Sequence, residues 1–330
     1  MKHISRKRAL AVPALAASLA LFLSACGGGD AAKKDENAAG GDAELQKITV
    51  GVMPIVDTAP IYLGQQEGFF EEEGLELDLQ SGQGGAAIVP GVVSGNFQIG
   101  FSNLVSIMVA NDKGMDLKFV ANGASTTGNK DKDFSAVIIK EDSDIKSAKD
   151  LEGKRVSVNT LANIGDTTVS QLVEEAGGDP KKVDFTEVGF PDAPAALDTG
   201  QVDAIWVLEP FLTAAMKDGG RVMSYNYADF DAGLDIAGYF TSAEMMEKDP
   251  EMVQKFTRAM NKSLDFAEEN PEKVREIVGT YTKIDEETRA EMVLPKFTSQ
   301  FNKDADQKLA DAAKKYGTLN NDLDVSTVLP

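Results

Sequence analysis

Histidine and cysteine are almost absent from this chain of 330 residues, which contains one of each. Both lie near the N-terminus, as His3 and Cys26, so the chain beyond residue 26 has neither. Ser-His-Asp and Cys-His nucleophile systems require a histidine, and protein zinc sites are built mainly from histidine and cysteine. Disulfides within the chain are excluded as well. We therefore expect a protein that is not an enzyme and that holds neither a metal nor a cofactor.

Basic residues are also scarce, with 33 Lys and Arg against 53 Asp and Glu, a net charge of −20. Residues 1–25 carry four basic residues and no acid, so their removal would change the net charge from −20 to −24. Proteins that bind nucleic acid neutralise phosphates with Lys and Arg. We therefore expect no nucleic-acid partner.

The longest uncharged apolar run spans residues 9–25 and follows a basic start. This pattern is typical of a secretory signal peptide, and the run is at the short limit for a membrane-spanning helix. It ends in Leu23, Ser24, Ala25 and Cys26, which resembles the bacterial lipobox, whose cysteine becomes the lipid-bearing N-terminus. We predict a signal peptide at 1–25, lipidation of Cys26, and a location at the cell membrane, anchored by lipid on its extracytoplasmic face. A soluble exported protein or an uncleaved anchor are the alternatives.

Residues 26–45 are rich in Gly, Ala and charge and poor in large apolar side chains. Such a segment buries too little apolar surface to order itself. We predict a flexible tether between the anchor and a folded body.

From residue 46 onward, short runs rich in β-forming residues alternate with helical patterns. The candidate strands are 48–52, 75–79, 97–101, 117–121, 136–139, 155–158, 204–207 and 221–224. Alternation of this kind predicts an α/β fold with parallel sheets. Similar strand starts at 48 and 154 indicate two similar lobes. Beyond residue 242 the pattern becomes helical, and the clearest helix begins at Asp249 and Pro250.

Ligands of open parallel sheets lie beyond the carboxyl ends of the strands. The turns expected there are rich in small, polar and acidic residues, and an aromatic residue lies near several of them. The candidate ligand-binding residues are Asp57, Thr58, Gly82, Gly84, Gly85, Ser102, Asn103, Ser125, Thr160, Asn163, Asp166, Phe190, Asp192, Trp206 and Glu209. Each also has an ordinary structural interpretation, as a helix cap, a tight turn, a surface acid or a core aromatic.

Two motifs are discounted. Residues 82–87 match the dinucleotide pattern G-x-G-x-x-A, but no acidic residue follows about twenty positions later to bind a ribose. A glycine nest that donates to a ligand oxygen is the better functional interpretation. Asp229, Asp231 and Asp235 have calcium-loop spacing but lack the terminal glutamate, which favours a surface acidic cluster.

Several ordered motifs between residues 47 and 274 resemble one family. They are ITVGV at 48–52, APIYL at 59–63, GFF at 68–70, GNFQIG at 95–100, DLEGKRV at 150–156, GQVDA at 200–204 and EPF at 209–211. On these motifs the chain resembles the nitrate-, sulfonate- and taurine-binding proteins, a group that includes binding proteins for thiamine-pyrimidine precursors.

The resemblance implies a periplasmic-binding-protein fold of type II, with two Rossmann-like lobes, a ligand cleft between them and a helical C-terminal region. Lobe one would combine 46–134 with 242–330, and lobe two would hold 135–241. It also implies a monomeric solute-binding lipoprotein of an ABC importer, which closes on a small solute and delivers it to a permease driven by an ATPase.

The expected turns contain no arginine, the usual bidentate partner of sulfonate or carboxylate, whereas Asp57, Asp166, Asp192 and Glu209 are acidic. This favours a nitrogenous heterocycle or an amine, although helix N-termini also bind anions, so a sulfonate stays open. Two other functions stay open: a sensor lipoprotein that signals by closure, and an enzyme similar to the pyrimidine synthases of the superfamily. By the same resemblance, those synthases depend on histidine and cysteine.

Overall fold

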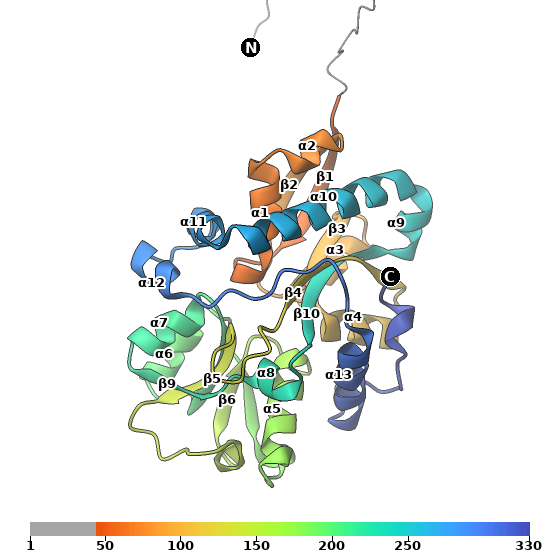
Figure 1. The fold of residues 1–330 in the computed structure, drawn as a ribbon. Coiled ribbons are helices and arrows are strands. Elements are labelled where there is room, and N and C mark those ends of the chain that lie inside the picture. Colours follow the sequence, from red (N-terminus) through yellow and green to blue (C-terminus); the bar gives the residue numbers. More distant parts are fainter. Residues whose placement is uncertain (1–43) are drawn as a thin grey trace, which may run out of the picture. The chain divides into compact units, whose positions relative to one another are not determined.

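The computed structural model describes residues 44–330 (Figure 1). The predicted signal peptide, Cys26 and nearly all of the predicted tether lie outside the described residues and stay predictions. Across 44–330, no helix combines the length and apolar character that a membrane crossing requires.

The first of two sheets has the strand order β2-β1-β3-β10-β4. Strand β1 runs parallel to β2 and β3, whereas β10 is antiparallel to both of its neighbours. The strands are β1 (Gln46–Val52), β2 (Leu75–Ser81), β3 (Ile99–Asn103), β4 (Leu117–Ser125) and β10 (Asp235–Ser242).

The second sheet has the order β7-β6-β8-β5-β9 and repeats the first: strand β6 lies between β7 and β8, and an antiparallel strand follows. The antiparallel strand of each sheet is the one that enters from the other sheet, β10 in the first and β5 in the second. The strands are β5 (Ser135–Lys140), β6 (Arg155–Val158), β7 (Asp184–Glu187), β8 (Ala204–Leu208) and β9 (Gly220–Ser224). This repeat confirms the predicted α/β class with two similar sheets.

We use lobe 1 for residues 44–125 with 235–330, and lobe 2 for residues 135–230. Segments 126–134 and 231–234 connect them. The helices of lobe 1 are α1 (Ala59–Gln66), α2 (Phe69–Glu72), α3 (Gly85–Val93), α4 (Leu104–Asp112), α9 (Ala243–Lys248), α10 (Pro250–Glu269), α11 (Pro271–Tyr281), α12 (Glu286–Glu291) and α13 (Lys303–Lys315). Those of lobe 2 are α5 (Ile164–Glu175), α6 (Ala193–Asp198), α7 (Phe211–Lys217) and α8 (Asn226–Phe230).

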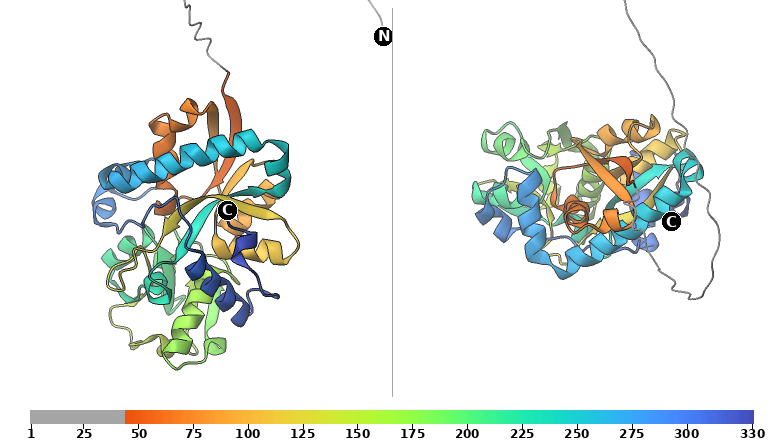
Figure 2. Two further views of the ribbon diagram at one scale, coloured as in Figure 1. Left: turned by 45° about the vertical axis from the view of Figure 1, so that its right-hand side comes forward. Right: turned by 90° about the horizontal axis from the view of Figure 1, so that it is seen from above.

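Helix α10 runs across lobe 1 beside α1 and α2 (Figure 1). Asp249 caps it by accepting a hydrogen bond from the Met252 backbone N–H at 3.0 Å. The predicted apolar stripe faces inward, because all of its members are buried: Val253, Phe256, Met260, Leu264 and Ala267. Helix α13 reaches lobe 2, where it packs on α5 (Figure 2).

Two strands were not predicted. Strand β7 is a short edge strand of four residues, Asp184–Glu187, with charged ends and no buried residue. Strand β10 is buried along nearly its whole length, so its sequence DIAGYFTS lacks the alternation that marks a half-buried strand. Because β10 pairs with β3 and β4, the second crossover between the sheets precedes residue 235 and not residue 242.

Candidate functional site

A small cavity lies between the lobes, beyond the carboxyl ends of β1, β3, β6 and β8. Its volume is about 20 Å³, enough for about one water molecule. Both lobes contribute to its lining, which consists of Met53, Ile55, Asp57, Phe101, Asn103, Asn159, Ile164, Phe190, Trp206, Leu208, Tyr227, Ile236 and Ala237.

Asp57 is the one charged residue of this lining. It lies in the short 3-10 helix Val56–Thr58, between β1 and α1, and its side chain is 1% exposed. Neither carboxylate oxygen has a hydrogen-bond partner among the described residues. Burial is the main cause that raises the pKa of Asp57 to about 7, and the nearby Asp133 carboxylate contributes in the same direction. The cavity therefore contains a carboxylate whose bonding capacity is unused.

Aromatic rings form the lobe 2 wall. Trp206, at 1% exposure, donates from its indole Nε1 to Ser135 Oγ at 2.9 Å, which fixes the plane of the ring. Phe190 meets Trp206 edge to face with ring centroids 5.3 Å apart, and Tyr227 meets it from another side at 6.0 Å. These rings present rigid apolar surface to a solute.

Tyr227 adds a hydroxyl group to the lining residues. Its hydroxyl is fully buried and has no hydrogen-bond partner of acceptable geometry among residues 44–330. Burial raises its pKa well above the usual value, and the Asp57 carboxylate raises it further. Ser135 partly offsets this, but its own hydroxyl already donates to Asn226 and accepts from Trp206.

Neutral amides complete the polar lining. Asn103 Oδ1 accepts the Ser106 backbone N–H at 2.9 Å and so caps α4, which leaves the amide nitrogen as a donor toward the cavity. Asn159, directly after β6, is the second lining amide and comes from lobe 2.

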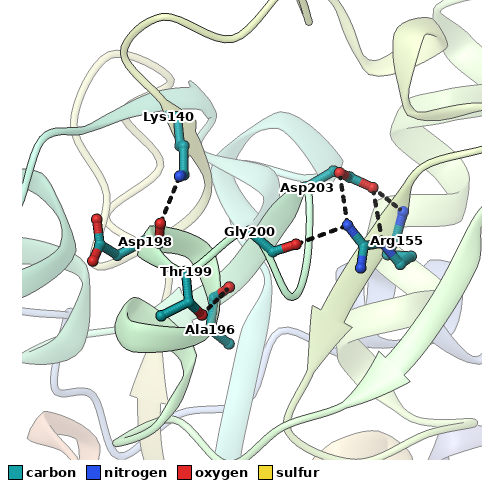
Figure 3. A network of polar contacts seen from close by, with 7 residues as sticks. All are labelled: Lys140, Arg155, Ala196, Asp198, Thr199, Gly200 and Asp203. Atoms are coloured by element: carbon teal, nitrogen blue, oxygen red, sulfur yellow. Dashed lines mark hydrogen bonds and ion pairs between the residues drawn. The ribbon is translucent and has the colours of Figure 1, made fainter.

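The two arginines of lobe 2 bind other groups of the protein. Arg155 starts β6 and binds the Asp203 carboxylate and the Gly200 carbonyl at the end of the sheet away from the cavity (Figure 3). Arg221 donates to three backbone carbonyls of residues 141–145. Neither lines the cavity, and no lysine does.

The lobes are closed on each other at several points. Asn163 Nδ2 of lobe 2 donates to Ser106 Oγ of lobe 1 at 3.0 Å. A side chain at Gly84 would lie 3.2 Å from Thr160 Oγ1, so only glycine allows this approach of the lobes without displacement. These contacts account for three predicted residues, Gly84, Thr160 and Asn163, which lie at the lobe interface and outside the cavity lining.

Glu209 forms a second connection between the lobes. Its carboxylate accepts from the backbone N–H of Thr213 at 3.0 Å and from that of Val293 in lobe 1 at 3.1 Å, and its carbonyl accepts from Val56 N–H at 3.2 Å. Burial raises its pKa to about 7 despite these bonds. Glu209 therefore joins lobe to lobe and is absent from the cavity lining.

Four predicted residues support the turns around the cavity. Thr58 Oγ1 donates to the Met53 carbonyl at 2.7 Å, which holds the β1 turn closed. Gly82 and Gly85 allow close packing, since an added side chain would meet Ile88 at Gly82 and Ser102 at Gly85. Ser102 is buried, and its hydroxyl is without a partner in the described part of the chain.

Three predicted residues point away from the cavity. Ser125 donates to Asp235. Asp166 accepts backbone N–H groups of Ala162 and Asn163 at the start of α5. Asp192 is exposed at the N-cap of α6. Of the fifteen predicted residues, the cavity lining contains Asp57, Asn103, Phe190 and Trp206.

Sequence reasoning missed Tyr227 and the start of β10, Ile236 and Ala237. Tyr227 lies in the five-residue helix α8, which has no cap signal.

A larger hollow of about 860 Å³ lies at the surface between the lobes, with Pro54 and Tyr281 on one side and Pro191 and Phe211 on the other. Asp57 and Tyr227 line the small cavity and not this hollow.

Comparison with known sequences gives a family match. Residues 55–274 match the profile of the family described as NMT1/THI5 like. The formylaminopyrimidine-binding protein of Halalkalibacterium halodurans is 24% identical over 272 residues, which cover 79% of this chain and 76% of that protein. The taurine-binding periplasmic protein of Escherichia coli is 25% identical over 217 residues, 66% of this chain and 65% of that protein.

Comparison with solved structures gives the fold. The alkanesulfonate-binding protein SsuA of Xanthomonas axonopodis, solved with MOPS bound, superposes with a TM-score of 0.73 at 17% identity, covering 87% of this chain and 99% of that one. The nitrate-binding protein NrtA of Synechocystis superposes with a TM-score of 0.75 at 13% identity, covering 87% and 86%. The predicted periplasmic-binding-protein fold is thereby confirmed.

Proposed function

The chain belongs to the NMT1/THI5-like family, and from this premise we propose that it is the extracytoplasmic solute-binding lipoprotein of an ABC importer. It captures a small organic solute of the nitrogenous heterocycle, amine or sulfonate class between its lobes. The closed form then delivers the solute to a permease driven by an ATPase.

The observation that carries this proposal is the cavity at the lobe interface. Its lining comes from both lobes, with Asp57, Phe101 and Asn103 on one side and Trp206 and Tyr227 on the other. A solute that contacts both walls is bound better by the closed arrangement than by an open one, so binding drives closure. A permease can then distinguish the loaded protein by its shape.

The same lining argues against an enzyme. Its one ionisable residue besides Tyr227 is Asp57. General acid-base chemistry would rest on Asp57 and Tyr227 alone, without the histidine and cysteine on which, by the resemblance, the pyrimidine synthases of the superfamily depend. Capture without conversion fits this set of side chains.

The membrane location rests on the sequence pattern around Cys26, which lies outside the described residues. A lipid on Cys26 would hold the body at the extracytoplasmic face of the cell membrane, where a monomer meets its permease.

The test is capture of a solute from a mixture. Residues 43–330 cluster as one compact unit with its own core, so a chain of these residues is suited to the measurement. It would be incubated with the low-molecular-mass fraction of a bacterial extract, washed, and analysed by native mass spectrometry. A bound small molecule that is released on unfolding supports the proposal. If no compound is retained from the extract or from a panel of amines, pyrimidines, flavins and sulfonates, the solute-binding function is wrong.

A further inference from the structure

The cavity lining contains an acidic side chain but no basic one. Asp57 is its one charged lining residue, and its two oxygens have no partner among the described residues. The Tyr227 hydroxyl is likewise without a partner there. Both side chains are at least 99% buried, at 1% and 0% exposure, so bulk water does not satisfy them.

The surroundings of Asp57 supply no compensating charge. The ionisable groups that face it are the Asp133 carboxylate and the hydroxyls of Tyr227, Tyr239 and Tyr281. Asp133 has its own partners, since it accepts from Thr126 Oγ1 and from the backbone N–H of Thr127 and Phe134. Burial of a carboxylate without a hydrogen-bond donor lowers the stability of the fold, whereas a hydrogen bond from a donor offsets this cost.

The walls beside these groups select for shape. Phe190 and Trp206 line the cavity together with Phe101 from the opposite lobe. Planar aromatic surfaces on both sides favour a flat, partly apolar solute.

We propose that the solute is a flat, ring-sized molecule that presents a nitrogen-bound hydrogen to the Asp57 carboxylate, as an amine, an amidine or a ring nitrogen does. This inference rests on the proposed function and names the solute class of the same site. The Tyr227 hydroxyl binds a second polar atom of the solute. A sulfonate or nitrate is disfavoured, because it would bring negative charge toward Asp57 in a cavity without a cationic side chain.

The cavity of about 20 Å³ is too small for a six-membered ring. The ring therefore enters an opened cleft, and the lobes close on it less completely than in this structure. This wider opening would break the Ser106–Asn163 hydrogen bond and separate Gly84 from Thr160.

The test uses probes that share a ring and differ in charge. Benzamidine and 4-aminopyrimidine carry nitrogen donors, whereas benzenesulfonate is an anion of similar size. Binding to the chain of residues 43–330 would be measured by isothermal titration calorimetry. The compound that this chain captures from extract would be measured in the same way.

Asp57→Asn removes the charge and keeps the shape, and it should weaken binding of a nitrogen-donor probe and of the captured compound about 100-fold or more. The control is Asp306→Asn, a second buried acid with an unpartnered oxygen, which accepts from the Asp235 backbone N–H and is absent from the cavity lining. This control should bind as the wild type does. If Asp57→Asn does not fold, Tyr227→Phe takes its place, with an expected loss of about 2- to 10-fold.

Binding of benzenesulfonate in preference to the nitrogen probes overturns the inference. So does an Asp57→Asn variant that binds the captured compound with wild-type affinity. If the extract yields a bound compound that has no nitrogen-bound hydrogen, the inference fails while the solute-binding function stands. Failure to capture any compound refutes the function itself, and the inference falls with it.

Discussion

Replacement of Asp57 by Asn should stabilise the solute-free protein, and the gain should depend on pH. The folded protein raises the pKa of this carboxyl from 3.8 to about 7, with burial as the main cause. The unfolded chain therefore releases this proton at lower pH than the folded one. Between about pH 4 and pH 7 the unfolded state binds fewer protons, so the free energy of unfolding falls as the pH rises.

The size of the effect follows from the shift. About three pH units at 1.36 kcal/mol each give about 4 kcal/mol of lost stability, complete above pH 7 and absent below pH 4. An asparagine and a protonated aspartic acid are nearly equal in shape and polarity. Asp57→Asn should therefore match the wild type at pH 4 and exceed it by up to about 4 kcal/mol at pH 8, about 8 °C or more in Tm.

The assay is urea unfolding followed by fluorescence of Trp206, the one tryptophan of the chain, at intervals from pH 4 to pH 8.5. The difference between variant and wild type is the relevant quantity, because burial also raises the pKa of Glu209 to about 7 and so contributes to the pH dependence of both proteins. A variant that is less stable than the wild type throughout would refute the reasoning. So would a difference that does not change with pH, since an ionisable group would then not be its source.

Three further changes test the lobe interface and the anchor. Ser106→Ala removes the hydroxyl that binds Asn163 across the lobes, so the free energy of unfolding should fall by about 1 kcal/mol and the radius of gyration in small-angle X-ray scattering should increase. An unchanged radius would mean that other contacts hold the lobes together. Glu209→Gln removes a second buried charge whose pKa is raised to about 7, but its amide nitrogen cannot accept a hydrogen bond from Thr213 or Val293, so its gain in urea unfolding at pH 8 should be smaller than that of Asp57→Asn. An equal or larger gain would mean that those bonds contribute nothing to stability. Cys26→Ser in the full chain should abolish palmitate labelling and move the protein out of the membrane fraction, and retained labelling would exclude this cysteine as the lipid site.

The fold was largely predictable from the sequence because strand and helix signals are local. Asn103 and Asp249 cap helices as expected, and the stripe of α10 is buried. Strand β10 was not predicted, because burial on both faces removes the alternation of apolar and polar residues that marks a half-buried strand. Its position beside β3 is a tertiary fact that no local pattern contains.

The candidate site was predictable in part. Asp57 and Asp166 occupy comparable positions: Asp57 precedes α1 after strand β1, and Asp166 lies in the first turn of α5 after strand β6. Asp166 bonds to the backbone N–H groups of its own turn, whereas Asp57 has no partner among the described residues. The position of a residue in such a turn predicts that its side chain lies near the cleft. The direction of that side chain depends on whether it can accept hydrogen bonds from backbone N–H groups of its own turn. Tyr227 was missed for a related reason, since α8 approaches the cavity only through packing on α5 and β5.

The contrast between Asp57 and three other buried acids supports the proposed role of Asp57 in solute recognition; a fourth buried acid, Asp306, also has an unpartnered oxygen but is absent from the cavity lining. Asp133 accepts three hydrogen bonds, Asp235 binds Ser125, Asn122 and the Asn302 backbone, and Glu209 binds Thr213 and Val293. Each of these carboxylates is fully used in holding one segment of the fold to another. Asp57 contributes nothing of that kind and destabilises the fold at neutral pH, so its bonding capacity is available to a molecule that is not part of the chain. Lobe closure around such a solute would recover the energy that burial of this carboxylate costs, which couples recognition of the solute to the change of shape.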